Sequence, residues 1–198
     1  MCCLLVKKKG VFIPKKYLKN AWRINPHGAG FASFREGKLL MRKGFMDFKS
    51  FYTTYRDFGD NDTILHFRWR SAGKISVENC HPFWVNPTMV VAHNGHINIL
   101  TKDEESDTST FNRQVLRRLL NDNKNFLDNP AIVYLISKSI GNSKLAFMDD
   151  EGKITIVNKG KGLDDSSGFW ASNDDYKTYR NMPNRHTTVG GVSESGWY

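Results

Sequence analysis

Short apolar runs recur along the chain between polar or turn-forming segments. Runs of this kind, rich in β-branched and aromatic residues, are typical of β-strands. They occupy residues 29–34, 39–41, 63–69, 88–93, 145–148, 154–157 and 169–171, after a further apolar run at residues 2–6. Turn-forming residues separate 29–34 from 39–41, and also 145–148 from 154–157, so each pair predicts a hairpin.

Apolar residues at helical spacing mark several of the segments between these runs. Residues 48–55, 110–120 and 130–140 predict three helices, and residues 174–180 predict a short fourth one. Strands and helices do not alternate strictly, as they would in a doubly wound sheet. The order of elements therefore predicts an α+β fold in which helices pack on antiparallel sheets.

The composition is that of one ordinary globular domain. The chain has 198 residues, of which 39% are hydrophobic and 25% are charged, enough for one substantial core. We expect the domain to span residues 1–180, followed by a polar tail at 181–198 that has little to bury. Only three cysteines are present, too few for the disulfide framework of a small secreted protein. With no signal-peptide pattern and no run of roughly 20 apolar residues, we expect a cytoplasmic protein without a membrane span.

Basic residues exceed acidic ones by 29 to 20, which gives a formal net charge of +9. This excess attracts anionic partners, and nucleic acid is one candidate. The basic clusters are scattered along the chain, as in residues 7–9, 15–16 and 117–118. No helix-turn-helix, zinc-finger or RNA-binding motif accompanies them, so the sequence favours a solvated basic surface over a specific nucleic-acid site.

Cys2 is the first candidate catalytic residue. Its side chain is small, which generally allows removal of Met1 and leaves a free α-amine on Cys2. With a reference pKa of about 7.7 to 8.0, that amine is partly uncharged near neutrality and can act as a base. One residue would then supply both nucleophile and base. The alternative is that Cys2 is simply a small buried residue.

A cluster of basic residues follows at 66–73. Alternation along a strand would place His66, Arg68 and Arg70 on one face, which suits an anion. Arg68 is the best candidate to hold a carboxylate, because its guanidinium can donate two parallel hydrogen bonds. The alternative is an exposed basic strand at a sheet edge.

The dipeptide Asn94-Gly95 ends an apolar strand. An Asn amide and the N–H of a following Gly make a natural oxyanion hole, because Gly lets the backbone approach a substrate closely. Asn-Gly is also a common turn, and the alternative is a hairpin turn between residues 90–93 and 96–100.

Asp107 precedes the predicted helix at 110–120 and could hold the ammonium group of a substrate. The alternative is helix capping, which Ser, Asp and Thr all favour. The six histidines and three cysteines include the pairs Cys80-His81 and His93-x-x-His96, but no set has the spacing of a zinc site. We therefore expect neither a metal ion nor a cofactor.

Taken together and in order, these motifs resemble the glutaminase domain of class II glutamine amidotransferases, which are N-terminal-nucleophile hydrolases. The resemblance spans most of the chain up to about residue 175 and implies a four-layer αββα sandwich with antiparallel sheets. Phe169 to Asn173 resembles a later strand of the family. The motifs that carry the resemblance are Met1-Cys2, NPHGAGFA at 25–32, HFRW at 66–69, ENCHPF at 78–83, AHNG at 92–95 and SDT at 106–108.

The resemblance implies hydrolysis of glutamine. Cys2 would attack the amide carbon and form a glutamyl thioester as ammonia leaves, while Asn94 and the Gly95 N–H stabilise the oxyanion. Water would then release glutamate. The residues implied to bind the substrate are Arg68 for the α-carboxylate and Asp107 for the α-ammonium, with Trp69, Ser71 and His81 shaping the pocket.

Some positions depart from the family pattern. Ala72 stands where members that aminate sugar phosphates often have histidine, and Ser109 stands where a glutamate is frequent. Both departures argue against a sugar acceptor. The segment GKISVENCHPF at 73–83 looks most like small stand-alone members, some of which cleave γ-glutamyl amides other than glutamine.

In large members of the family, a synthase domain follows the glutaminase domain and receives the ammonia. Here the sequence continues only for a short tail, so we expect any acceptor to be a separate protein. A small viral or accessory enzyme that feeds a partner acting on a nucleotide or nucleic acid would fit the basic surface. The competing hypothesis is an inactive basic scaffold that binds nucleic acid or a protein partner.

Overall fold

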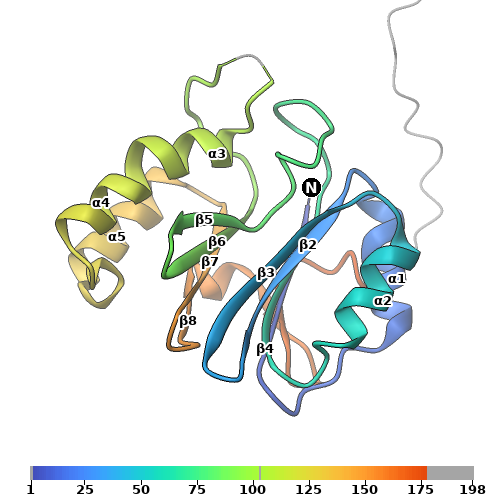
Figure 1. Cartoon of the computed structure of the whole chain (residues 1–198). Helices are drawn as coiled ribbons and strands as arrows, with labels where there is room; N and C mark the ends of the chain where they lie inside the picture. The colour runs from blue at the N-terminus through green and yellow to red at the C-terminus, as the bar shows by residue number, and fades with distance from the viewer. Residues whose placement is uncertain (1, 103, 178–198) are drawn as a thin grey trace, which may run out of the picture.

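The computed structural model describes residues 2–102 and 104–177 and contains two antiparallel sheets (Figure 1). The first sheet has the order β3-β2-β4-β1-β10-β9, and the second has the order β5-β6-β7-β8. The strands of the first sheet are β1 (Cys3–Lys7), β2 (Ala29–Arg35), β3 (Lys38–Phe45), β4 (Asp62–Phe67), β9 (Leu163–Asp164) and β10 (Trp170–Ala171). Those of the second are β5 (Phe83–Asn86), β6 (Met89–Asn94), β7 (Lys144–Asp149) and β8 (Ile154–Val157).

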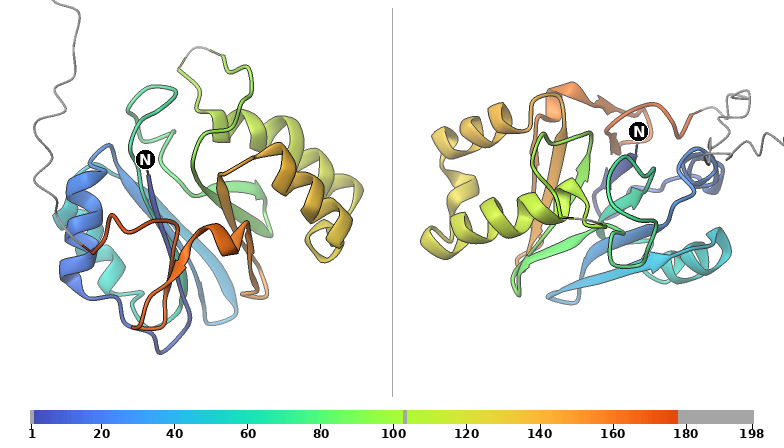
Figure 2. Two further views of the ribbon diagram at one scale, coloured as in Figure 1. Left: turned by 180° about the vertical axis from the view of Figure 1, so that it is seen from behind. Right: turned by 90° about the horizontal axis from the view of Figure 1, so that it is seen from above.

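Helices cover the outer face of each sheet, as the view from above shows (Figure 2). On the first sheet lie α1 (Lys15–Ile24) and α2 (Phe48–Arg56). On the second lie three further α-helices, α3 (Asp107–Phe111), α4 (Arg117–Asp122) and α5 (Pro130–Ser139). A π-helical segment, η1 (Asn112–Leu116), joins α3 to α4, and the short 3₁₀ segments are η2 (Phe126–Asp128) and η3 (Lys159–Lys161).

Each central strand is buried on both faces, because a sheet lies on one side of it and helices on the other. In β1, Leu5 packs toward the helices, whereas Leu4 and Val6 pack in the core between the sheets. In β6, Val91 packs toward its helices, whereas Val90 faces the other sheet. The continuous apolar runs of these strands follow from this double burial. The arrangement confirms the predicted α+β fold with four αββα layers.

Most of the predicted elements are present, and their bounds differ in part. Both predicted hairpins form, as β2 with β3 and as β7 with β8. The helix predicted at 110–120 begins at Asp107, and the strand predicted at 63–69 ends at Phe67. Residues 174–177 form a turn instead of the predicted helix, and the rest of that range lies outside the described residues, as does the tail at 181–198.

Two features of the described residues bear on what the chain can bind. None of the helices in the described ranges is both long and apolar enough to cross a membrane. Within the same ranges, no group of three or more His, Cys, Asp or Glu side chains is arranged to hold a metal ion.

Candidate active site

A pocket at one end of the sandwich gathers residues from five separate segments of the sequence. Antiparallel pairing of β1 with β4 places Cys3 opposite Phe67, so the start of β1 lies beside the end of β4. β6 also ends here, because Asn94 donates a hydrogen bond to the carbonyl of Cys2. Of the predicted site residues, the pocket is lined by Cys2, Arg68, Trp69, Ser71, His81, Gly95 and Asp107.

The Cys2 thiol lies against the backbone of Trp69. Its Sγ is 3.3 Å from both the nitrogen and the carbonyl oxygen of Trp69, so the thiol can donate to one and accept from the other. Burial raises the pKa of the thiol, while the Trp69 N–H and the charge of Arg68 act in the opposite direction. The thiol is therefore protonated at neutral pH and needs a base before it can attack.

Arg68 follows directly after β4, and its side chain is only 3% exposed. Its Nη1 donates to the carbonyl of Lys74 and its Nη2 to that of Ala72, both at 2.9 Å. A guanidinium has five N–H donors, so three remain for a ligand. The loop carbonyls thus fix the orientation of a cation that still has donors to offer.

Two expectations for this basic cluster are wrong. His66 and Arg68 are buried on a central strand and its extension, not exposed at a sheet edge. Arg70 is exposed and does not share their face. Backbone pairing continues one residue beyond β4, because the Arg68 N–H donates to the Gly28 carbonyl and the Arg68 carbonyl accepts from the His27 N–H. The Arg70 N–H instead donates to the His27 side chain, so the strand alternation does not continue to Arg70.

Asn94 is the last residue of β6, and the predicted alternative of a hairpin turn at this position is wrong. β6 pairs with β5 and β7, and residues 96–100 form no strand. The Asn94 side chain is fully buried, and the Nδ2 that donates to Cys2 carries a second N–H. The amide is thus anchored to the backbone of Cys2 without using both of its donors.

Gly95 lines the pocket next to Asn94. Its φ of 135° is a conformation that residues with a side chain rarely adopt, and an added Cβ would lie 2.2 Å from Ser143 Oγ. Only glycine fits here without displacing Ser143. The backbone N–H of Gly95 can therefore approach a substrate closely.

Asp107 is the first residue of the helical run, and the predicted capping role belongs to its neighbour. Ser106 is the N-cap, and its hydroxyl accepts from the Ser109 N–H. The Asp107 carboxylate is 5% exposed and accepts from the N–H groups of Ile97 and Thr108, each at 2.8 Å. Oδ1 also accepts from the Thr108 hydroxyl at 3.3 Å, and Oδ2 lies 3.6 Å from His96 Nδ1. Oδ2 keeps a lone pair, so the fixed carboxylate can still accept from an ammonium group.

Asn79 joins the two loops that carry Arg68 and Asp107. Its Nδ2 donates to the carbonyls of Lys74 and Glu104, at 3.1 and 2.8 Å, and its Oδ1 accepts from the Ser106 N–H at 3.2 Å. A single buried amide therefore sets the spacing between the cationic and anionic sides of the pocket.

Three buried histidines lie in or behind the pocket. His81 Nδ1 is 2.8 Å from His66 Nε2, and His93 Nδ1 is 2.7 Å from the hydroxyl of Thr108. Burial is the main cause that lowers the pKa of His66 to about 3, that of His93 to about 4, and that of His81 well below its usual value. All three imidazoles are neutral at pH 7.

Trp69 and Ser71 occupy the rim. The indole of Trp69 is half-buried against the ring of His27, with 4.7 Å between ring centroids, and Ser71 is exposed. Sequence reasoning assigned no role to His93 or Asn173. Asn173 Nδ2 donates to the Cys2 carbonyl at 2.8 Å, a contact that only the pairing of β10 with β1 brings about.

The pocket combines a thiol, a fixed cation, a fixed carboxylate and amide donors. Such a set can hold the two charged ends of an α-amino acid while a nucleophile attacks its side chain. A larger groove lies elsewhere, between α4 and the turn from β7 to β8, and is lined by Lys153 and several carboxylates. It contains none of the predicted site residues.

No protein-family profile matches the sequence, and no curated protein matches it. Among solved structures, the chain is similar to a glutamine phosphoribosylpyrophosphate amidotransferase from B. subtilis, determined in complex with ADP and GMP. The two sequences are 13% identical and the TM-score is 0.48. The match covers 89% of this chain and 42% of the other, so this chain spans less than half the length of that protein. A likeness this distant identifies neither a family nor an activity.

Proposed function

We propose that this protein hydrolyses the side-chain amide of glutamine with Cys2 as an N-terminal nucleophile. The observation that carries the proposal is the convergence of Cys2, Arg68, Gly95 and Asp107 on one pocket from four separate segments. Each of these residues alone has a structural explanation. Together they supply a nucleophile, an oxyanion donor and a grip for each charged end of an amino acid.

The reaction begins with removal of Met1, which frees the α-amine of Cys2. The raised pKa of the buried thiol makes this base necessary, and an amine with a reference pKa of about 7.7 to 8.0 can take the thiol proton. The thiolate attacks the amide carbon, and the oxyanion forms beside the Gly95 N–H and the second N–H of Asn94 Nδ2. The amine returns its proton to the leaving ammonia, and water then cleaves the thioester to give glutamate.

Substrate recognition rests on two buried charges of opposite sign. Arg68 offers its remaining N–H donors to the α-carboxylate, and Asp107 accepts from the α-ammonium. Both groups are held by loop or helix backbone before the substrate arrives, which lowers the entropic cost of binding. Trp69, Ser71 and His81 form the remaining walls.

A glutamine-analogue diazoketone tests the proposal directly. We expect one adduct per chain, mapped by mass spectrometry to an N-terminal peptide that begins at Cys2, and release of glutamate from glutamine by the unlabelled protein. Labelling at Cys80, or full activity of a protein that retains Met1, would contradict the mechanism.

The pocket specifies the glutamyl half of a substrate more closely than the leaving group. We therefore include larger γ-glutamyl amides as an alternative substrate class, to be separated by comparing kcat/KM for glutamine with that for γ-glutamyl alkylamides. The three free cysteines are all buried, and we place the reaction in the reducing cytoplasm, where the thiol stays active.

An inactive basic scaffold is the competing function. It predicts no glutamate release and no adduct at Cys2 with any candidate partner present. Arg68 and Asp107 are both buried in one pocket, and burying charged groups costs folding free energy. A scaffold has no use for that cost, whereas an enzyme uses both charges to bind its substrate.

A further inference from the structure

A second surface lies on the opposite side of the first sheet from the sheet-sheet core. Helices α1 and α2 lie side by side there (Figures 1 and 2) and enclose a groove of about 310 Å³. Its lining includes four cationic residues and two aromatic ones, namely Lys15, Lys19, Lys49, Arg56, Phe48 and Tyr52. This groove takes no part in the proposed glutamine reaction.

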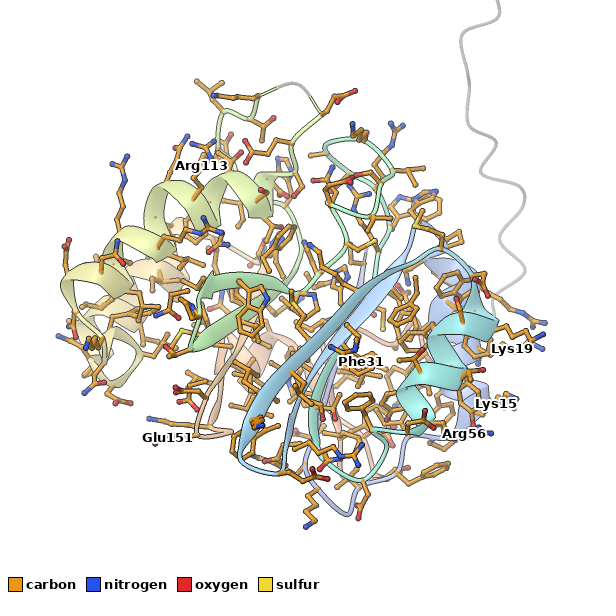
Figure 3. The ribbon with its side chains drawn as sticks, in the orientation of Figure 1. Lys15, Lys19, Phe31, Arg56, Arg113 and Glu151 are labelled. Atoms are coloured by element: carbon orange, nitrogen blue, oxygen red, sulfur yellow. The ribbon has the colours of Figure 1, made fainter. Side chains whose placement is uncertain are left out.

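The cations of this groove lie on two adjacent helix faces. Lys15 and Lys19 are four residues apart on α1, and Lys49 and Arg56 are seven apart on α2, so each pair shares a face. Figure 3 shows Lys15, Lys19 and Arg56 along one outer edge of the molecule. The two helices place like charges together, an arrangement that costs stability unless an anion joins them.

Carboxylates do not neutralise this cluster. Neither helix contains Asp or Glu, and none of the four cations forms a salt bridge within residues 2–102 and 104–177. The acidic residues nearest in the sequence are Asp47 and Asp57, one at each end of α2. Asp47 caps the helix and is hydrogen-bonded to Ser50, and Asp57 is exposed and forms no salt bridge with the four cations among the described residues. The groove therefore presents a concentrated positive charge to solvent.

Two aromatic rings lie among these cations. Phe48 and Tyr52 are half-buried and stacked, with 5.7 Å between ring centroids and an angle of 19° between the planes. Lys15 Nζ lies 4.4 Å from the centre of the Tyr52 ring. Flat rings recessed between cations match a chain in which charged groups alternate with flat bases.

We propose that the groove between α1 and α2 binds a single-stranded nucleic acid. The four cations contact successive phosphates. When Lys15 moves from the Tyr52 ring to a phosphate, Tyr52, backed by Phe48, offers a stacking surface to a base. The rings are recessed rather than protruding, which favours a nucleic acid over a membrane surface. The aromatic lining favours it over an acidic peptide, for which charge alone would suffice.

Fluorescence anisotropy with a labelled single-stranded oligonucleotide tests this proposal. With four phosphate contacts, we expect log K to fall with log salt with a slope of about −3, from about −0.7 per contact. The double variant Lys19→Glu, Arg56→Glu should bind about tenfold more weakly at about 50 mM salt, with a slope shallower by at least about 1. Equal binding by this variant and the wild type would overturn the proposal.

The matched control is the double variant Arg118→Glu, Lys138→Glu. It changes the net charge by the same amount as the groove variant, but at exposed residues on α4 and α5, in the opposite outer layer. We expect its affinity to stay within about threefold of the wild type, because the groove is intact. An equal loss in both double variants would mean that net charge, not the groove, controls binding. Circular dichroism on each variant shows whether a loss of binding comes from misfolding. Glutamate release on each variant shows whether the proposed glutamine reaction is affected separately from nucleic-acid binding.

Two further ligands separate a nucleic acid from other anions. Inorganic polyphosphate carries the charge without bases, and anionic phospholipid vesicles present it on a membrane. We expect the oligonucleotide to bind about fivefold or more tightly than polyphosphate at equal charge, since each stacked base adds affinity. Equal affinity for polyphosphate, or tighter binding to vesicles, would overturn the assignment to nucleic acid.

Discussion

Cys2 Sγ lies 3.3 Å from the Trp69 carbonyl oxygen, in a position where burial keeps the thiol protonated. Replacing it tests its role as nucleophile. We expect Cys2→Ser to lower kcat/KM by about 10³-fold or more and to abolish the diazoketone adduct, because a hydroxyl is a far weaker nucleophile than a thiolate. The control is Cys80→Ala, which removes another buried free cysteine and should leave the adduct in place.

The charge of Asp107 can be tested by a substitution that keeps the shape of the side chain and one of its two acceptor oxygens. Asp107→Asn keeps an oxygen acceptor for the Ile97 or Thr108 N–H but removes the negative charge. We expect kcat/KM for glutamine to fall by about 10- to 100-fold, the equivalent of about 1.5 to 3 kcal/mol for a charged hydrogen bond.

A substrate analogue that lacks the α-ammonium provides the control for Asp107. Its kcat/KM should be the same in the wild type and in Asp107→Asn, because the carboxylate then has no cation to bind. A similar loss for both substrates would show that Asp107 acts only by supporting the helix start.

At the scale of elements, Asn79 connects the loop after β4 to the loop before α3. We expect Asn79→Ala to raise KM for glutamine about tenfold and to lower the free energy of unfolding by about 1 to 3 kcal/mol, since it leaves buried partners unsatisfied. The matched control is Asn86→Ala, which removes two hydrogen bonds from Thr88 in the turn after β5, away from the pocket. A change in stability with no change in KM would restrict Asn79 to a structural role.

Local patterns predicted the elements whose partners are close in the sequence. The hairpins β2-β3 and β7-β8 and the helices α2 and α5 have apolar residues at regular spacing and clear turn or cap residues. Helix α1 was not predicted, because it buries only Leu18, Asn20 and Ala21 and is otherwise rich in lysine. β5 and β9, strands of four and two residues, were not predicted either, because they are too short for a period to be recognised.

Contacts between distant segments could not be predicted from local patterns. β1 lies between β4 and β10, which follow it by about 60 and more than 160 residues. This pairing brings Asn173 to Cys2 and buries His66 beside His81. The predicted site residues depended on a resemblance of motifs, and the structure brings them to one pocket only through the order of the strands.

At the scale of the whole molecule, the sandwich places the pocket where both sheets end. The core between the sheets is continuous from Leu4 and Ile64 on one side to Val90 and Ala146 on the other. Toward the pocket, polar side chains take the place of this apolar core, and His66 and His93 are buried there on facing strands. Burying these ionisable side chains costs free energy of folding, and this cost depends on pH.

The three neutral histidines make stability fall below neutral pH. Their pKa values are lowered by burial, to about 3 for His66 and about 4 for His93, against a reference of about 6.5 in the unfolded chain. Below pH about 6.5 the unfolded state takes up protons that the folded state does not, so stability declines toward lower pH. Each histidine contributes up to about 1.4 kcal/mol per pH unit.

Denaturant unfolding between pH about 7 and about 5 measures this decline in a range where carboxylates still remain ionised. We expect His66→Gln to be less stable than the wild type at neutral pH, because His81 loses its partner, but to show a shallower decline toward pH about 5. The difference in free energy of unfolding between the wild type and His66→Gln should therefore narrow as the pH falls. If this difference stayed constant between pH about 7 and about 5, His66 would not be held neutral by the fold.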